Sequence, residues 1–114
     1  LIEQIIVIGE GEKHTAAFIM PAVEGLRFWC QKHKINYSNL EEIIHNPKVI
    51  KKFEREIEKY NNYFNQYERI KKFELIGKAW SVDGGELTAT MKLRRKNILS
   101  KYENLYKKIY NNDI

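Results

Sequence analysis

Two short apolar runs joined by a glycine-bounded turn, IEQIIVIGEGEKHTAAFIMP (residues 2–21), decide the fold of this chain. Residues 2–9 are rich in β-branched side chains and end at a glycine, which is typical of a buried strand. Residues 15–21 form a second such run that stops at Pro21. The turn between them is GEGEKH (9–14), so the stretch predicts an antiparallel β-hairpin.

Helical signals follow the hairpin. Pro21 is predicted to start a helix, because proline suits the first helical position, and this helix ends near Lys34. Ser38 and Glu41 have the spacing of a capping box and predict a short helix over residues 40–45.

A longer helix is predicted to open at Asn46-Pro47 and to run to about Phe64. Its apolar residues recur every three or four positions and form an amphipathic stripe: Val49, Ile50, Phe53, Ile57, Tyr60 and Phe64. Basic and acidic residues alternate on the opposite side, which indicates a solvated face with exposed ion pairs.

The last third of the chain predicts a strand, a loop and a helix. ERIKKFELIG (68–77) forms the third strand, KAWSVDGGELTAT (78–90) the loop, and residues 91–110 the final helix. The expected fold class is therefore α/β (α+β): a small three-stranded sheet flanked by about four helices.

Length and composition limit the class of protein. At 114 residues, 43% hydrophobic and 31% charged, the chain is one folded domain and too apolar for intrinsic disorder. Cys30 is the single cysteine, so no internal disulfide forms and a cytoplasmic location is expected. The net charge of +5 suits nucleic acid, anionic lipid or phosphorylated metabolites.

Most candidate chemistry in the sequence is weak. His14, His33, His45 and Cys30 lack zinc-ligand spacing, so no metal site is predicted and surface, capping or core roles are expected. GEGEK (9–13) joins two strands and is too short for a dinucleotide-binding fingerprint.

The stretch GGELTATMKLRRKNIL (84–99) differs from these. It supplies flexible backbone and hydroxyls ahead of a predicted helix, with Lys92 at the first turn. Free N–H groups and a mobile lysine suit phosphate or carboxylate. Two interpretations remain open on the residues alone: an anion site, or a solvated helix end.

Two separated segments carry a family resemblance. EQIIVIGEGEKHTAAFIMP and ELTATMKLRRKNILSKY, with NPKVIKKFEREIEKYN between them, resemble the C-terminal domain of AMP-forming acyl-CoA synthetases of the adenylate-forming superfamily. The long-chain fatty-acid–CoA ligases are most similar, since their closing motif reads close to G-E-L-T-P-T-x-K-x-(K/R)-R. The resemblance implies that residues 1–114 are this mobile domain, with the hinge and the N-terminal domain before Leu1.

The resemblance also implies roles for individual residues. Lys92 matches the catalytic lysine that assists acyl-adenylate formation. Glu86, Thr88, Thr90 and Arg95 match the surrounding motif and are expected to contact substrate or nucleotide.

In the family, the small domain adopts two poses, one for adenylation and one for attack by CoA. The implied activity is that of an AMP-forming acid–thiol ligase, with ATP and CoA as substrates beside the fatty acid and Mg accompanying ATP. The N-terminal domain of the same chain is the implied partner, with peripheral membrane association of the full-length enzyme as an option. The isolated domain is expected to be inactive. Ala89 stands where the family usually has proline, which leaves the effect of that loop on activity open.

One alternative belongs to a different class: a non-enzymatic basic module that binds RNA or an acidic protein through the last helix. Cations there outnumber Glu103, namely Lys92, Arg94, Arg95, Lys96, Lys101, Lys107 and Lys108. The aromatic residues that such a module would expose are mostly assigned to apolar stripes. This assignment favours the ligase hypothesis, and no nucleic-acid partner is expected.

Overall fold

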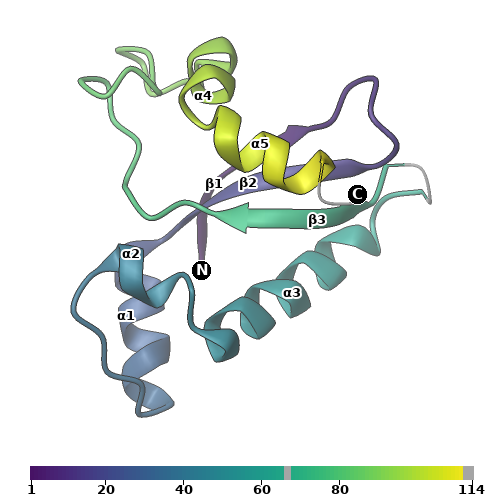
Figure 1. Cartoon of the computed structure of the whole chain (residues 1–114). Helices are drawn as coiled ribbons and strands as arrows, with labels where there is room; N and C mark the ends of the chain where they lie inside the picture. Colours follow the sequence, from purple (N-terminus) through teal and green to yellow (C-terminus); the bar gives the residue numbers. More distant parts are fainter. Residues whose placement is uncertain (66–67, 112–114) are drawn as a thin grey trace.

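The computed structural model describes residues 1–65 and 68–111. β1 (Ile2–Ile8) and β2 (Thr15–Pro21) pair antiparallel, as predicted, and β3 (Ile70–Leu75) pairs parallel with β2. The described sheet is therefore mixed, with strand order β1-β2-β3 (Figure 1). β2 lies in the middle and is almost continuously buried, which explains its unbroken apolar sequence.

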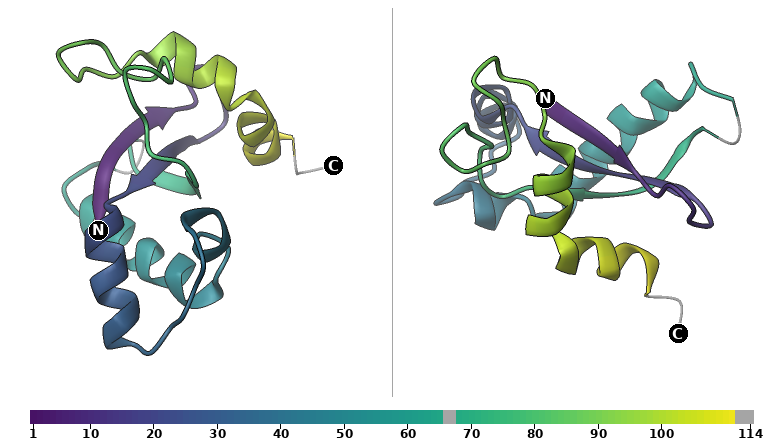
Figure 2. Two further views of the ribbon diagram at one scale, coloured as in Figure 1. Left: turned by 90° about the vertical axis from the view of Figure 1, so that its left-hand side faces the viewer. Right: turned by 90° about the horizontal axis from the view of Figure 1, so that it is seen from above.

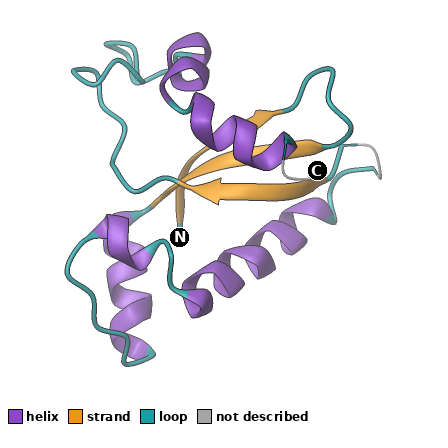
Figure 3. Cartoon of the chain, in the orientation of Figure 1, coloured by secondary structure: helices purple, strands orange, loops and turns teal. Residues whose placement is uncertain are grey.

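The alternation of side chains along β2 divides the interior into two cores. Ala17 and Ile19 point to one face of the sheet, whereas Ala16, Phe18 and Met20 point to the other. Helices cover both faces, so the domain has three layers (Figure 3).

The first face is covered by the segment that connects β2 to β3. It contains α1 (Val23–Lys32), α2 (Leu40–Ile43) and α3 (Pro47–Asn61). Their buried side chains are entirely apolar and include Leu26, Ile43, Val49, Phe53 and Ile57. Because parallel strands cannot be joined by a tight turn, this helical crossover is what the pairing of β2 with β3 requires.

The second face is covered by α4 (Arg95–Lys101) and α5 (Glu103–Tyr110). Their buried residues, Ile98 and Ile109, pack with Ile8, Phe18 and Trp80. A long loop between β3 and α4 reaches out beyond the sheet before it returns to this face (Figure 2).

Several predicted helix boundaries were wrong. Pro21 ends β2, and α1 begins at Val23. The cap of α2 is Asn39, whose Oδ1 accepts a 2.9 Å hydrogen bond from the Glu42 N–H, so the predicted box at Ser38 is shifted by one residue. α3 does open at Asn46-Pro47, as predicted, but ends at Asn61.

The ends of two predicted helices also differ in what they bury. Tyr60 is exposed on the last turn of α3, and Phe64 lies beyond its end. The predicted final helix begins at Arg95 rather than at residue 91 and is interrupted at Tyr102. The described residues therefore contain five helices, because the fourth predicted helix is two.

Candidate functional site

Residues 87–93, here called the lysine hairpin, form a small β-hairpin just before α4. Leu87 and Leu93 pair as an antiparallel bridge, and the Thr88 N–H donates to the Lys92 carbonyl oxygen at 2.8 Å. The Met91 N–H donates to the Thr88 carbonyl oxygen at 2.8 Å, and Met91 has a φ of 65°. Three-residue hairpin loops commonly consist of a turn followed by a residue whose backbone is in the left-handed conformation. Lys92 therefore lies on a hairpin, and the prediction of a first helical turn there was wrong.

Two predicted binding residues, Thr88 and Thr90, shape the turn beside Lys92. Thr88 Oγ1 accepts a 3.0 Å hydrogen bond from the Lys92 N–H and lies 3.2 Å from Thr90 Oγ1. The Lys92 side chain is exposed, and its ammonium has no hydrogen-bond or ion-pair partner among the described residues. The structure thus brings three of the predicted site residues together, with the cation free to meet an anion.

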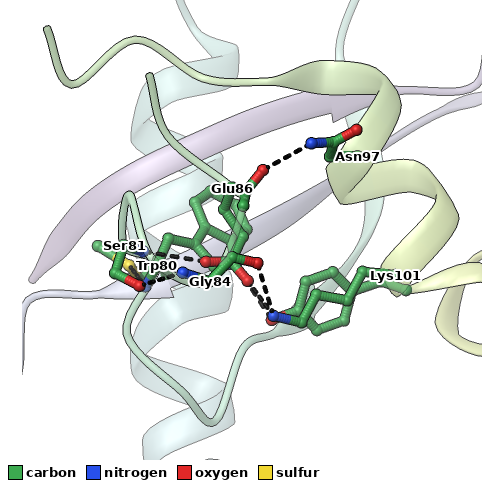
Figure 4. Close-up of polar contacts among 9 residues, drawn as sticks. Trp80, Ser81, Gly84, Glu86, Asn97 and Lys101 are labelled. Carbon is green, nitrogen blue, oxygen red and sulfur yellow. Dashed lines mark hydrogen bonds and ion pairs between the residues drawn. The ribbon is translucent and has the colours of Figure 1, made fainter. Parts of the chain in front are cut away.

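The base of the hairpin rests on Glu86, whose side chain is 3% exposed. Glu86 Oε1 accepts a 2.9 Å hydrogen bond from the Ser81 N–H, and Glu86 Oε2 pairs with the Lys101 ammonium (Figure 4). The Glu86 carbonyl oxygen accepts a 2.8 Å hydrogen bond from the Arg94 N–H on the other arm. Glu86 is thus engaged within the domain, while the expected contact with nucleotide stays a prediction.

Electrostatics keep the Glu86 carboxylate ionised in spite of its burial. Burial raises the pKa of Glu86, but the Lys101 ammonium and the Ser81 N–H together outweigh it, so the pKa lies below its ordinary value. The same pairing with Glu86 raises the pKa of Lys101. Both groups are therefore charged at neutral pH.

Arg95 begins α4 just after the hairpin and contacts β1. Its Nη1 donates to the Val7 carbonyl oxygen at 2.7 Å and so ties the start of α4 to the outer edge of the sheet. Lys96 and Arg94 are exposed and form no side-chain ion pair among the described residues. The four cations of the motif thus differ, because among the described residues Arg95 alone of the four forms a side-chain hydrogen bond.

Sequence reasoning missed Ser81 and Asn97, and it placed Lys101 only on the basic surface of the alternative hypothesis and not beside Glu86. Asn97 Nδ2 donates to the Gly85 carbonyl oxygen at 2.9 Å, and Lys101 reaches Glu86 from the last turn of α4. Lys101 and Glu86 are 15 residues apart, with a hairpin between them. No helical or strand spacing could have paired them.

The weaker candidates have different surroundings. The ring of His14 stacks on Tyr110 at a centroid distance of 5.0 Å, and that of His33 lies 4.3 Å from Trp29. Cys30 is fully buried, and burial raises the pKa of its thiol. Across residues 1–65 and 68–111, no three His, Cys, Asp or Glu side chains gather as a metal site would require.

The described helices are also too short or too polar to cross a lipid bilayer.

A family model described as the AMP-binding enzyme C-terminal domain matches residues 1–113. The chain therefore belongs to this family of domains, as the resemblance of its motifs implied.

Curated relatives include long-chain acyl-CoA enzymes. Long-chain-fatty-acid–CoA ligase FadD15 of Mycobacterium tuberculosis is 28% identical over 114 residues, which cover 99% of this chain and 19% of the ligase. Long chain acyl-CoA synthetase 8 of Arabidopsis thaliana is 22% identical over 99 residues, which cover 85% of this chain and 14% of the synthetase. The chain thus spans only a small part of the length of these relatives.

Solved structures share the fold. The A-PCP didomain of carboxylic acid reductase from Segniliparus rugosus, in complex with AMP, matches 98% of this chain and 14% of its own with a TM-score of 0.74 at 17% identity. The adenylation domain of a carboxylate reductase from Mycobacterium chelonae matches 97% of this chain and 16% of its own, with a TM-score of 0.73 at 19% identity.

Proposed function

We propose that this domain supplies Lys92 to the adenylation step of an AMP-forming long-chain fatty-acid–CoA ligase. The observation that carries the proposal is the Lys92 ammonium itself, exposed and unpaired among the described residues, on a hairpin whose base is held by buried contacts. The family match over residues 1–113 and the names of the curated ligases support the same assignment.

In the adenylation pose, the ammonium would bridge the acyl carboxylate and the α-phosphate of ATP. The carboxylate oxygen attacks the phosphorus, pyrophosphate leaves, and negative charge develops on the phosphoryl oxygens. A fixed cation at that point stabilises the developing charge without reorganisation of solvent. Thr88, Thr90 and Arg95 would line this surface, and Mg would accompany ATP on the remainder of the enzyme.

In the second pose, the domain would rotate against the N-terminal domain so that CoA attacks the acyl-adenylate. Lys92 has no task in that step. We propose a cytoplasmic location for the full-length enzyme, with peripheral membrane association where its fatty-acid substrate resides. The domain alone is expected to be inactive.

The test is Lys92→Ala in the full-length ligase that carries this domain, with the two half-reactions measured separately. Adenylation should fall on the order of 10²- to 10³-fold, because a stabiliser of developing charge is lost. Thioester formation from supplied acyl-adenylate should be largely retained. Lys96→Ala, which removes an exposed cation nearby, is the matched control and should leave adenylation close to the wild-type rate. Equal loss in both half-reactions would overturn the role of Lys92.

The alternative of a basic binding module loses support from the pairing of its cations. Lys107 Nζ lies 3.0 Å from Glu103 Oε1, and Lys108 Nζ lies 3.0 Å from Glu74 Oε1. Lys101 is paired with Glu86. Three of the seven cations assigned to that surface are therefore neutralised locally, which leaves less charge for phosphate contacts.

A further inference from the structure

We propose that Lys101 and Glu86 are positioning residues for Lys92. Their ion pair fastens the base of the lysine hairpin to α4 and thereby sets where the Lys92 ammonium points. This inference rests on the proposed function of Lys92.

The first step is that Glu86 joins three pieces of backbone. Its side chain accepts from Ser81, which starts the loop segment before the hairpin, and from Lys101 on α4. Its main-chain oxygen accepts from Arg94, which follows the hairpin. One residue therefore links the entry to the hairpin, the exit from it and the helix behind it.

The second step is that the segment 81–86 wraps closely around the carboxylate (Figure 4). The Gly84 N–H donates to Ser81 Oγ at 2.8 Å, and Lys101 Nζ lies 3.3 Å from the Gly84 carbonyl oxygen. A Cβ at Gly84 would overlap the Glu86 carboxylate, so a larger residue at this position would displace the carboxylate from its partners. Asn97 adds a second tie from α4 to the same segment through the Gly85 carbonyl oxygen.

The third step is that stability alone does not explain the pair. Leu87 is buried, and Leu93 packs against the same apolar core without any need for a charge. This ion pair is a poor source of stability, because burial of the Glu86 carboxylate offsets part of the attraction and solvent screens the Lys101 side chain, which is 39% exposed. What the hydrogen-bonded ion pair does provide is a defined orientation, since it holds its two groups in one geometry.

The fourth step concerns Lys92, whose side chain forms no hydrogen bond or ion pair among the described residues. Its placement therefore follows from the backbone of the hairpin, and the base of that hairpin is the Glu86–Lys101 pair. A change at this base should move the ammonium away from its substrate without removing it.

The experiment uses Lys101→Met in the full-length ligase, with Lys107→Met as the matched control. Lys107 also pairs with a glutamate, Glu103, but both side chains are more than half exposed on α5. Lys101→Met should lower kcat of adenylation on the order of 10- to 100-fold, as misplacement of a catalytic group does. Thioester formation from supplied acyl-adenylate should be largely retained, and Lys107→Met should leave both half-reactions unchanged. Equal loss of both half-reactions in Lys101→Met would overturn the inference.

A double variant separates positioning from general damage. In the Lys92→Ala background, Lys101→Met should cause no further loss of adenylation, because the residue through which it acts is gone. A further loss of the same size would show that Lys101 acts independently, and the inference would fail.

Glu86→Gln, which removes the charge of the pair and keeps the shape of the side chain, provides a milder variant should Lys101→Met not fold. It should accelerate hydrogen exchange of the Thr88, Lys92 and Arg94 amides and lower adenylation, while amides of β2 remain protected. Unchanged exchange and unchanged adenylation would overturn the inference.

The two proposals can fail separately. If Lys92→Ala had no effect on adenylation, the proposed function would fail. If Lys92→Ala lowered adenylation but Lys101→Met did not, the positioning role alone would be rejected.

Discussion

The two faces of the sheet bury different chemistry. The face under α1, α2 and α3 holds an entirely apolar core around Phe53. The face under α4 and α5 also has an apolar core, but it is bordered by tyrosines and by Glu86, the buried charged side chain among the described residues. Apolar packing is non-directional, whereas hydrogen-bonded charges demand one geometry. The comparison indicates that both faces supply stability through apolar packing, whereas the second face also carries the charged contacts that we propose fix the lysine hairpin.

The largest expected effect on stability comes from Phe53→Ala on the first face. Phe53 is fully buried, so the loss of transfer energy and the cavity should cost about 3–5 kcal/mol of unfolding free energy. Urea denaturation measures this cost. The ratio of the two half-reaction rates in the folded full-length enzyme should not change.

Phe28→Ala on α1 is the matched control, because Phe28 is 67% exposed and should lose little stability. If Phe53→Ala lowered adenylation selectively, the separation of the two faces would be contradicted.

A smaller effect, dependent on pH, is expected from Glu86→Gln on the second face. The pKa of Glu86 is below its ordinary value because of Lys101 and Ser81, which outweigh burial. Its contribution to stability is therefore fully present above the pKa of the unfolded carboxyl group, about 4.3, and is lost as pH falls through the lower folded value. At pH 7, Glu86→Gln should cost on the order of 1–3 kcal/mol. Urea unfolding at pH 7 and below pH 4 should show the two proteins converging in acid.

Glu56→Gln on α3 is the control for this pH dependence. Its pKa is also lowered, chiefly by the hydrogen bond from Lys52, whose Nζ lies 2.8 Å away. Because this pair is spaced i,i+4 on a helix surface, its loss should cost only about 0.3–0.5 kcal/mol. If the two substitutions lowered the unfolding free energy by similar amounts, the Glu86–Lys101 pair would contribute no more than a surface ion pair.

The sequence predicted most of the fold because local patterns determine it. The β1–β2 hairpin and the Asn46-Pro47 start of α3 depend on neighbouring residues, and both predictions were confirmed. The apolar stripe of α3 was confirmed at Val49, Phe53 and Ile57, but it overran the helix at Phe64. Phe64 keeps the helical spacing of apolar residues in the sequence, although the helix has already ended at Asn61.

The site was harder to predict, because its geometry comes from contacts distant in sequence. Lys92 was found from its motif, but the helix predicted over residues 91–110 included it, where the chain forms a hairpin. The Thr88 hydroxyl competes for the backbone N–H of Lys92, which favours a turn over a helix. The partner of Glu86 depends on the tertiary fold, which no local spacing encodes.

The smallest effect tests the corrected cap on the first face. Asn39 Oδ1 accepts from the Glu42 N–H, and Glu42 Oε2 accepts from the Ser38 N–H at 2.9 Å. Asn39→Ala should therefore cost about 1 kcal/mol, the usual contribution of an N-cap. Ser38→Ala should cost almost nothing, because Ser38 takes part through its backbone. Urea midpoints of the two variants decide between the caps. A larger loss for Ser38→Ala would restore the capping box inferred from sequence, whereas the expected order would show that Asn39, and not Ser38, supplies the side-chain cap of α2.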